Sequence, residues 1–262
     1  MGFYDPDTVG MVSPREMVKA FTTFRGVREE NLSLPSSAII TFSLRMLNDL
    51  VRVADGNAFE SWYGRNTRLF QAKVGDYPIV LTMAPHGAPS AVILLEELIA
   101  FGVERAVFVG YCGSIQDRVR LGEIVLPIDT VREEGTSYHY VPVEAPCRPD
   151  GMLLNSLDQS LHRVGLPTNK GAVWTTDALY RETKDKVGRY RANGVLGVDM
   201  ETAALYAVGA VRKVPVVCLL LVSDLFSCGV WTPGFFDSVL VEREYVLAGA
   251  LVEWIREVCG SS

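Results

Sequence analysis

Three acidic side chains have the types and the spacing of a catalytic site: Asp199, Glu201 and Asp224. Asp224 follows the aliphatic run 214–222, which predicts a buried strand, so its carboxyl group should lie at a strand end where the dielectric is low. A carboxyl group in that setting can keep its proton and act as a general acid. A turn at Ser223 and Asp224 that caps the next segment explains the same position equally well.

Asp199 and Glu201 flank Met200 at the predicted start of a helix. The helix dipole favours carboxylates there, so a structural role is the simpler explanation for either residue alone. Beside Asp224 they also supply the paired acceptors that bidentate recognition of neighbouring sugar hydroxyls requires. Both interpretations stay open at this point.

Two further segments are candidate ligand contacts. His86 lies in a loop rich in glycine and proline, where it could touch a ligand, although a lone histidine is more often an ordinary loop residue. Residues 110–113, Gly-Tyr-Cys-Gly, follow a predicted strand, and their backbone N–H groups could cradle an anion. A G-x-x-G spacing alone is weak support for such a site.

The composition favours one large α/β domain and argues against several classes of partner. With 262 residues, 48% of them apolar, the chain can bury a sizeable core. The net charge of -6 and the lack of a basic stripe argue against nucleic-acid binding. The longest apolar run is far shorter than the roughly 20 residues of a membrane helix, and the N-terminus has no secretory pattern. We therefore expect a cytoplasmic protein with no membrane partner.

The cysteines and histidines do not have the spacing of a metal site. The five cysteines form neither close pairs nor ligand-like groups with the three histidines. This pattern is typical of reduced thiols in a cytoplasm rather than of a disulfide framework. We expect neither a metal nor a disulfide.

Turn residues and helix caps divide the chain into alternating strands and helices. Predicted strands cover residues 38–42, 67–74, 77–83, 105–109, 123–127, 171–175 and 214–222, with 67–74 and 77–83 as a hairpin and 131–141 extended and partly exposed. Predicted helices cover residues 14–24, 43–53, 90–101, 152–164, 182–193, 201–212 and 238–258, capped near their starts by residues such as Ser13, Ser43 and Ser90.

This alternation predicts an α/β fold: a single three-layer domain with a central mixed, largely parallel twisted sheet flanked by helices. Residues 1–36 should form an N-terminal arm and short helix, and residues 37–262 the α/β domain. Ligands of such sheets bind outside the carboxyl ends of the strands, which places the candidate sites after Met83, Val109 and Val222.

Five motifs follow one another in an order that resembles a known family. They are residues 87–91 (Gly-Ala-Pro-Ser-Ala), 110–116 (Gly-Tyr-Cys-Gly-Ser-Ile-Gln), 132–137 (Arg-Glu-Glu-Gly-Thr-Ser), 198–204 (Val-Asp-Met-Glu-Thr-Ala-Ala) and 223–224 (Ser-Asp). Over roughly residues 37–258 the chain resembles the nucleoside phosphorylase superfamily, which holds purine nucleoside phosphorylases, uridine phosphorylases and nucleoside hydrolases. The resemblance implies a phosphorylase-like fold, a nucleoside substrate and a homo-oligomer, a dimer or a trimer of dimers, with shared active sites.

The resemblance also implies roles for the acidic residues. Met200 and Glu201 would lie against the ribose, with His86 as a further ribose contact. Asp199 would occupy the neighbouring acidic position, which is normally a glutamate. In purine-specific members, an aspartate at the position of Asp224 protonates or hydrogen-bonds N7 of the leaving base. Asp224 and Glu201 are therefore the predicted catalytic residues.

The predicted base pocket points to a purine. Residues 182–185, Glu-Thr-Lys-Asp, lack the glutamine and arginine that read uracil in uridine-specific members. A stacking phenylalanine of the family is replaced by Leu179, and Tyr180 and Trp174 are the candidates to compensate. The base-binding residues implied by the resemblance are Leu179, Tyr180, Asp224, Cys112 and Gly113.

The chain departs from the family at the phosphate pocket, which we predict to be altered. Its implied residues are Arg45, Gly110, Tyr111 and Arg65. The glycine-rich loop expected at residues 40–45 keeps only the arginine, and Phe108 and Tyr111 replace an arginine and a serine or threonine. The loss of a guanidinium removes a bidentate contact to the anion. A nucleosidase would need a carboxylate near Thr41, and none is there.

Three functions remain open on this basis. Cleavage of the N-glycosidic bond of a purine nucleoside by phosphorolysis is narrowly favoured, with no cofactor and inorganic phosphate as the co-substrate. A phosphate-independent nucleoside hydrolase is the first alternative. A binding protein that senses a nucleoside or base without turnover is the second.

Overall fold

The computed structural model describes residues 3–6, 10–62, 68–227 and 229–260. Within these residues ten strands form one sheet in the order β10-β9-β6-β7-β8-β5-β1-β4-β3-β2, and β9 pairs in addition with β5. The strands are β1 (Ser37–Thr41), β2 (Asn57–Ala58), β3 (Leu69–Val74), β4 (Tyr77–Met83), β5 (Arg105–Ser114), β6 (Ile124–Glu133), β7 (Thr168–Thr176), β8 (Gly197–Asp199), β9 (Val216–Ser227) and β10 (Val230–Pro233).

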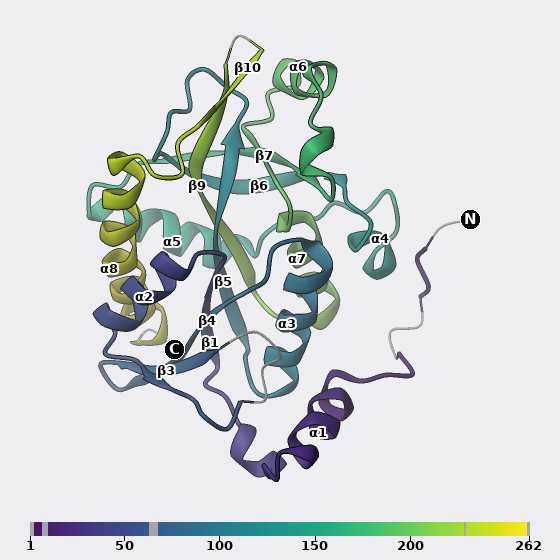
Figure 1. Cartoon of the computed structure of the whole chain (residues 1–262), viewed down its shortest axis with the longest axis vertical. Coiled ribbons are helices and arrows are strands. Elements are labelled where there is room, and N and C mark those ends of the chain that lie inside the picture. Colours follow the sequence, from purple (N-terminus) through teal and green to yellow (C-terminus); the bar gives the residue numbers. More distant parts are fainter. Residues whose placement is uncertain (1–2, 7–9, 63–67, 228, 261–262) are drawn as a thin grey trace.

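Helices cover the sheet on both faces, as the sequence predicted. The α-helices are α1 (Pro14–Phe24), α2 (Leu44–Val53), α3 (Ala88–Ala100), α4 (Ser137–Tyr140), α5 (Gly151–Arg163), α6 (Lys184–Ala192), α7 (Thr202–Arg212) and α8 (Ser238–Gly260), with 3-10 turns η1 (Glu29–Leu32) and η2 (Leu179–Arg181). In Figure 1, α2, α5 and α8 lie on one side of the strands and α3 and α7 on the other. The α/β fold with a mixed sheet and flanking helices is confirmed.

Each face of the sheet has its own core because side chains alternate along a strand. In β1, Ala38 and Ile40 join the apolar cluster under α3 and α7, whereas Ile39 joins the cluster under α2, α5 and α8. The long registers β1–β4, β1–β5, β5–β9 and β6–β7 are parallel, and the hairpin β3–β4 is antiparallel.

One end of the sheet closes on itself, which the sequence did not predict. Strand β9 pairs with both β5 and β6, and β7 and β8 complete a ring of strands. A third apolar cluster belongs to this ring and includes Cys112, Val125, Val173 and Val222. The closure fixes the carboxyl-terminal parts of the parallel strands β5 and β9 side by side, with the short antiparallel strand β8 next to β5.

Local capping predictions hold at the N-terminal helices. Ser13 forms a capping box with Glu16 at the start of α1, and the Ser43 side chain accepts a hydrogen bond from Met46 N at the start of α2. Helix α1 buries Val18 in the cluster shared with α3, so the N-terminal segment packs on the rest of the chain. The proposed division of the chain at residue 36 stays a prediction.

Three local predictions were wrong in detail. Helix α3 begins at Ala88 with Gly87 as its N-cap, so Ser90 lies inside the helix. The segment 110–113 is not a loop, because β5 continues to Ser114 and pairs with β9. Residues 131–141 are not extended throughout, since β6 ends at Glu133 and helix α4 follows.

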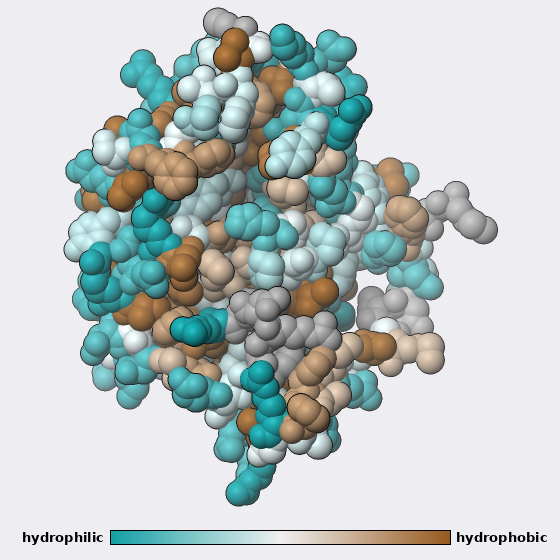
Figure 2. All heavy atoms as spheres, in the orientation of Figure 1, coloured by the Kyte–Doolittle hydropathy of each residue, from teal (hydrophilic) through white to brown (hydrophobic). Residues whose placement is uncertain are grey.

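The surface in the orientation of Figure 1 mixes hydrophilic and hydrophobic residues over all its elements (Figure 2). Such a mosaic is usual, because more than half of the accessible surface of a folded protein comes from apolar atoms. Among the described helices, none is long and apolar enough to cross a membrane.

Candidate active site

A cavity of about 570 Å³ lies at the carboxyl ends of β1, β4, β5, β8 and β9, where the strand order predicts a ligand. We call it the central cavity. Ten of the predicted site residues meet there with aromatic side chains from β9, β10 and the following loop. Its wall consists of Phe42, His86, Tyr111, Cys112, Gly113, Leu179, Tyr180, Glu182, Val198, Asp199, Met200, Glu201, Ser223, Asp224, Phe226, Trp231 and Phe235.

Asp224 is held inside strand β9 rather than at its end. Its Oδ2 accepts a hydrogen bond from Trp231 Nε1 at 2.8 Å, and its Oδ1 accepts one from Ser223 Oγ at 2.7 Å. The register of β5 and β9 shifts beside Gly113, which faces Asp224. A Cβ at Gly113 would lie 2.7 Å from Asp224 Oδ2 and 2.7 Å from the Phe226 ring, so only glycine fits there.

Glu201 borders the same cavity from the start of α7 and is fixed by a backbone donor. Gly87 N donates to Glu201 Oε1 at 2.6 Å. Gly87 adopts φ +93, a left-handed conformation that glycine takes without strain and that orients this N–H at the first turn of α3. Burial, followed by the neighbouring Asp199, raises the pKa of the Glu201 carboxyl group.

Asp199 caps helix α7 from inside the fold. Its Oδ2 accepts hydrogen bonds from Thr202 N at 2.8 Å and Glu201 N at 3.3 Å, and its Oδ1 accepts one from Thr175 Oγ1 at 2.7 Å. Burial raises the pKa of this carboxyl group although those donors oppose the shift. Asp199 borders the central cavity, but its oxygens are already bonded to protein donors, as the structural interpretation of the sequence expected.

The remaining predicted sugar contacts border the same cavity. Met200 is half-buried, and His86 is exposed with its ring edge-on to Phe42 at 6.0 Å between centroids. Met200 precedes Glu201 in the chain, and His86 precedes Gly87, whose N–H donates to the Glu201 carboxylate.

The predicted base pocket is open on one side. Leu179 is 48% exposed and Tyr180 is 95% exposed at the mouth, whereas Cys112 is buried in the floor. Burial raises the pKa of the Cys112 thiol, so it remains protonated and unreactive. Trp174 cannot compensate for the leucine, because it is fully buried against Tyr190 and does not border the cavity.

A half-buried carboxyl group joins the base end of the central cavity. Glu182 borders the cavity together with Asp224. Burial and then the charge of Asp224 raise the pKa of Glu182 to about 7. The sequence drew attention to this position only as the place where a uracil-reading side chain is missing.

The predicted phosphate residues do not form an open anion pocket. Arg45 Nη2 donates to Glu244 Oε1 at 2.9 Å, and Arg45 Nε donates to the other oxygen of the same carboxylate. The hydroxyl of Tyr111 also donates to Glu244, whose side chain is fully buried. Burial raises the pKa of Tyr111, so its hydroxyl stays neutral and remains a donor. Arg45 Nη2 lies 3.4 Å from the carbonyl of Phe235.

Other parts of the phosphate prediction do not reach the cavity. Gly110 pairs with Leu220 in the sheet and packs against Phe42, so its backbone is part of a strand and not of a cradle. Phe108 is buried in the core beside Phe42 and does not border the cavity, so it fills no anion space there. Arg65 lies outside the described residues.

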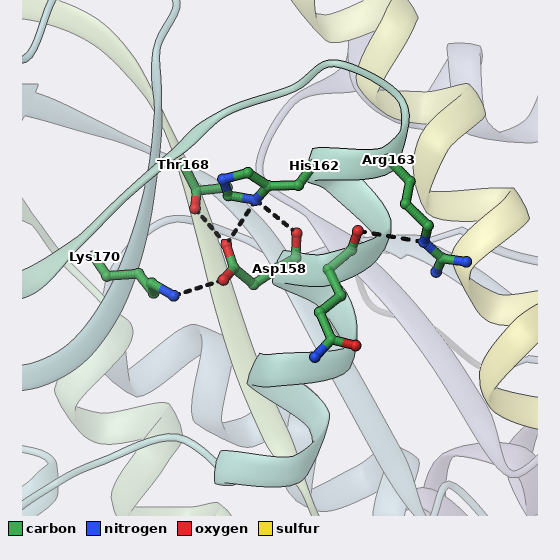
Figure 3. A pocket seen from close by; sticks show the side chains of 6 residues that line it. Asp158, His162, Arg163, Thr168 and Lys170 are labelled. Carbon is green, nitrogen blue, oxygen red and sulfur yellow. Dashed lines mark hydrogen bonds and ion pairs between the residues drawn. The ribbon is translucent and has the colours of Figure 1, made fainter.

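A second hollow lies beside α5 and the start of β7 and is lined by charged groups that bond to one another (Figure 3). Asp158 accepts hydrogen bonds from Lys170 Nζ at 2.6 Å and from Thr168 Oγ1 at 2.5 Å, and His162 Nδ1 lies 3.2 Å from it. Burial raises the pKa of Asp158, but the bonds from Lys170 and Thr168 outweigh it and lower the pKa. The hydrogen bonds from Lys170 and Thr168 to Asp158 connect β7 to α5, so we assign these groups a structural role.

Within the described part of the chain, no group of three or more His, Cys, Asp or Glu side chains could hold a metal ion. Four cysteines of that part are free thiols.

Comparison with known proteins agrees with this geometry. The family model described as the phosphorylase superfamily matches residues 37–253, which include the whole central cavity. The chain belongs to the phosphorylase superfamily. Its fold is that of a solved relative, the uridine phosphorylase of Vibrio fischeri ES114, with a TM-score of 0.78 and 25% identity over 87% of this chain and 93% of that one.

Curated members of the superfamily match over shorter stretches. The uridine phosphorylase of Escherichia coli K12 is 25% identical over 174 residues, 61% of this chain and 66% of that protein. The DeoD-type purine nucleoside phosphorylase of Bacillus velezensis is 36% identical over 143 residues, 53% of this chain and 60% of that protein. The chain thus spans less than two thirds of either relative's length, and the two relatives act on different classes of base by name.

Sequence reasoning missed two residues that border this superfamily member's cavity and one that lies behind its wall. Phe226 lies two residues after Asp224 on the same strand, and alternation along a strand would have placed both on one face. Trp231 reaches Asp224 because β10 folds back antiparallel on β9. Glu244 had no local signal, because its partners are 199 and 133 residues away in the chain.

Proposed function

We propose that this chain cleaves the N-glycosidic bond of a purine nucleoside. The observation that carries the proposal is that two buried carboxyl groups, those of Asp224 and Glu201, border one cavity of about 570 Å³ in a chain of the phosphorylase superfamily. A cavity of this size suits a small ligand. The two groups come from different elements, so each can contact a different half of a nucleoside.

In the proposed reaction Asp224 serves the base and Glu201 the sugar. Asp224 donates a proton or a hydrogen bond to N7, which removes the negative charge that builds on the base as the C1′–N9 bond breaks. Glu201 accepts hydrogen bonds from the ribose hydroxyls and favours the cationic sugar that forms, with Met200 and His86 beside it. Asp199 fixes the start of α7 and so positions Glu201.

The assignment of a purine rests on Asp224 and on the apolar walls. A carboxyl group that is supported by Trp231 and Ser223 suits the N7 edge, which pyrimidines lack. Leu179 and Phe226 supply apolar contact for the ring, and Glu182 adds an acceptor for an exocyclic or ring N–H group.

Two acceptors compete for the sugar. Phosphate is the acceptor that the names of the relatives suggest, and phosphorolysis was narrowly favoured from the sequence. Water is the second candidate, and the bidentate pair between Arg45 and Glu244 favours it, because that arginine is already engaged.

We further propose a homo-oligomer, since the exposed mouth at Tyr180 leaves room for residues of a neighbouring subunit. Light scattering of the purified protein tests this, and a fully active monomer would contradict it.

The decisive experiment supplies inosine, adenosine, guanosine, 5′-methylthioadenosine and uridine with and without phosphate. Free base and ribose 1-phosphate are then followed by chromatography. Release of purine but not uracil supports the substrate assignment, and preferential release of uracil contradicts it. Ribose 1-phosphate identifies phosphorolysis, whereas free ribose at an unchanged rate without phosphate identifies hydrolysis. Tight binding without release of any base would instead identify the binding protein.

A further inference from the structure

The cluster of Arg45, Tyr111 and Glu244 directs three donors at one internal anion. Both nitrogens on one edge of the Arg45 guanidinium and the Tyr111 hydroxyl donate to the two oxygens of Glu244. Glu244 is 0% exposed, so its carboxylate is shielded from bulk solvent and its two oxygens are held by these three donors. A guanidinium edge that binds a carboxylate in this way presents the same geometry to two oxygens of a phosphate.

This cluster lies directly behind the wall of the central cavity. Tyr111 borders the cavity and bonds to Glu244, and Phe235 borders the cavity while its carbonyl accepts from Arg45. Arg45 lies in the first turn of α2, where the helix dipole also favours a negative charge. The Arg45 guanidinium, the Tyr111 hydroxyl and the N-terminus of α2 therefore all favour an anion at this position. The Glu244 carboxylate is that anion.

We propose that the Glu244 carboxylate is a built-in substitute for an external oxyanion, which excludes inorganic phosphate from Arg45 and leaves water as the acceptor. Glu244 reaches the cluster from α8, 199 residues along the chain from Arg45 and 133 from Tyr111. It is a specificity-determining residue that acts through Arg45 and Tyr111. The choice of water rests on the proposed function, whereas the exclusion of phosphate does not.

In the proposed hydrolysis the reacting groups are water, the nucleoside and the Asp224 carboxyl group. The water oxygen forms a bond to C1′ as the C1′–N9 bond breaks, and the electron pair of that bond goes to the base. The base takes a proton at N7 from Asp224, the attacking water releases a proton to solvent, and Asp224 takes up a proton from solvent before the next turnover. No oxidant, metal or further reactant is needed.

The test removes the internal anion and measures phosphate binding directly. E244A opens the space of the carboxylate beside Arg45, and E244Q keeps that space filled by an uncharged group of the same shape. Each variant and the wild type are titrated with phosphate by calorimetry and by thermal unfolding, with chloride at matched ionic strength as the reference. We expect E244A to bind phosphate at least about tenfold more tightly than wild type or E244Q, the gain of one charge-assisted contact.

Two further measurements separate this inference from its alternatives. The double variant R45A/E244A should lose the phosphate response that E244A gains, because the guanidinium is the proposed anion ligand. If E244A does not fold, the wild type still decides the point: its melting temperature and its base release should be the same in phosphate and in chloride. Equal phosphate binding by wild type and E244A, or a response that survives in R45A/E244A, would overturn the proposal. If no nucleoside is cleaved, the binding comparison stands by itself, so failure of the proposed function is seen separately.

Discussion

Replacement of Asp224 by asparagine removes a proton donor while leaving the surrounding hydrogen bonds intact. Trp231 Nε1 donates to Oδ2 at 2.8 Å and can donate to the amide oxygen in the same way. Ser223 Oγ lies 2.7 Å from Oδ1 and can turn its hydroxyl to accept from the amide nitrogen. Because no buried group loses its partner, the cost in folding stability should stay below about 1 kcal/mol.

The catalytic cost of D224N should be much larger than its structural cost. General acid catalysis contributes about 10²–10⁴-fold, so kcat for a purine nucleoside should fall by that factor, about 3–5 kcal/mol at 1.36 kcal/mol per decade. KM should change little, since the amide can still hydrogen-bond to N7. A nitrophenyl riboside, whose leaving group needs no proton, should be cleaved at nearly the wild-type rate.

The assay for D224N therefore compares two substrates in one variant. The matched control is W231F, which keeps the aromatic ring and the acid but removes one donor, and it should lose less than about tenfold in kcat. A D224N enzyme that cleaves purine nucleosides within a few-fold of wild type would refute the acid role. An equal loss with the nitrophenyl riboside would refute it as well, because that loss could not come from protonation of the base.

Two more predictions concern the neighbours of this acid. Burial and Asp224 raise the pKa of Glu182 from 4.5 to about 7, so the folded state binds this proton more tightly than the unfolded state does. The stability that the protonated group contributes is therefore complete below pH 4.5 and is lost as the pH rises through about 7. The melting temperature of E182Q minus that of the wild type should therefore increase between pH 4.5 and about 7. A difference that stays constant with pH would contradict the raised pKa. G113A places a Cβ 2.7 Å from Asp224 Oδ2 and the Phe226 ring, so it should cost about 1–3 kcal/mol of unfolding free energy and displace the acid. Denaturant unfolding checks this against G188A, where nothing lies within 4 Å and no such cost is expected.

Local chemistry determined much of the fold from the sequence alone. The Ser13 capping box, the Ser43 cap and the hairpin around residues 75–76 depend on groups a few positions apart, and all three are present. The alternation of strands and helices follows from the period of the apolar residues, which is set by the geometry of each element. The sequence also predicted that Asp224 and Glu201 lie near each other, and both border the central cavity.

Tertiary structure decided which partners these groups have. The sequence left Asp199 with two explanations, and only the fold brings Thr175 of β7 to its carboxylate and so satisfies it inside the protein. It gave Arg45 as a phosphate ligand, yet Glu244, which shows no local sign of burial, reaches it from α8. Hydrogen bonds between elements so distant in the chain depend on how helices pack on the sheet, and a periodic pattern does not contain that information. The sequence thus determined the elements and the acidic residues that border the central cavity, and the packing of α8 against α2 decided which anion the arginine holds.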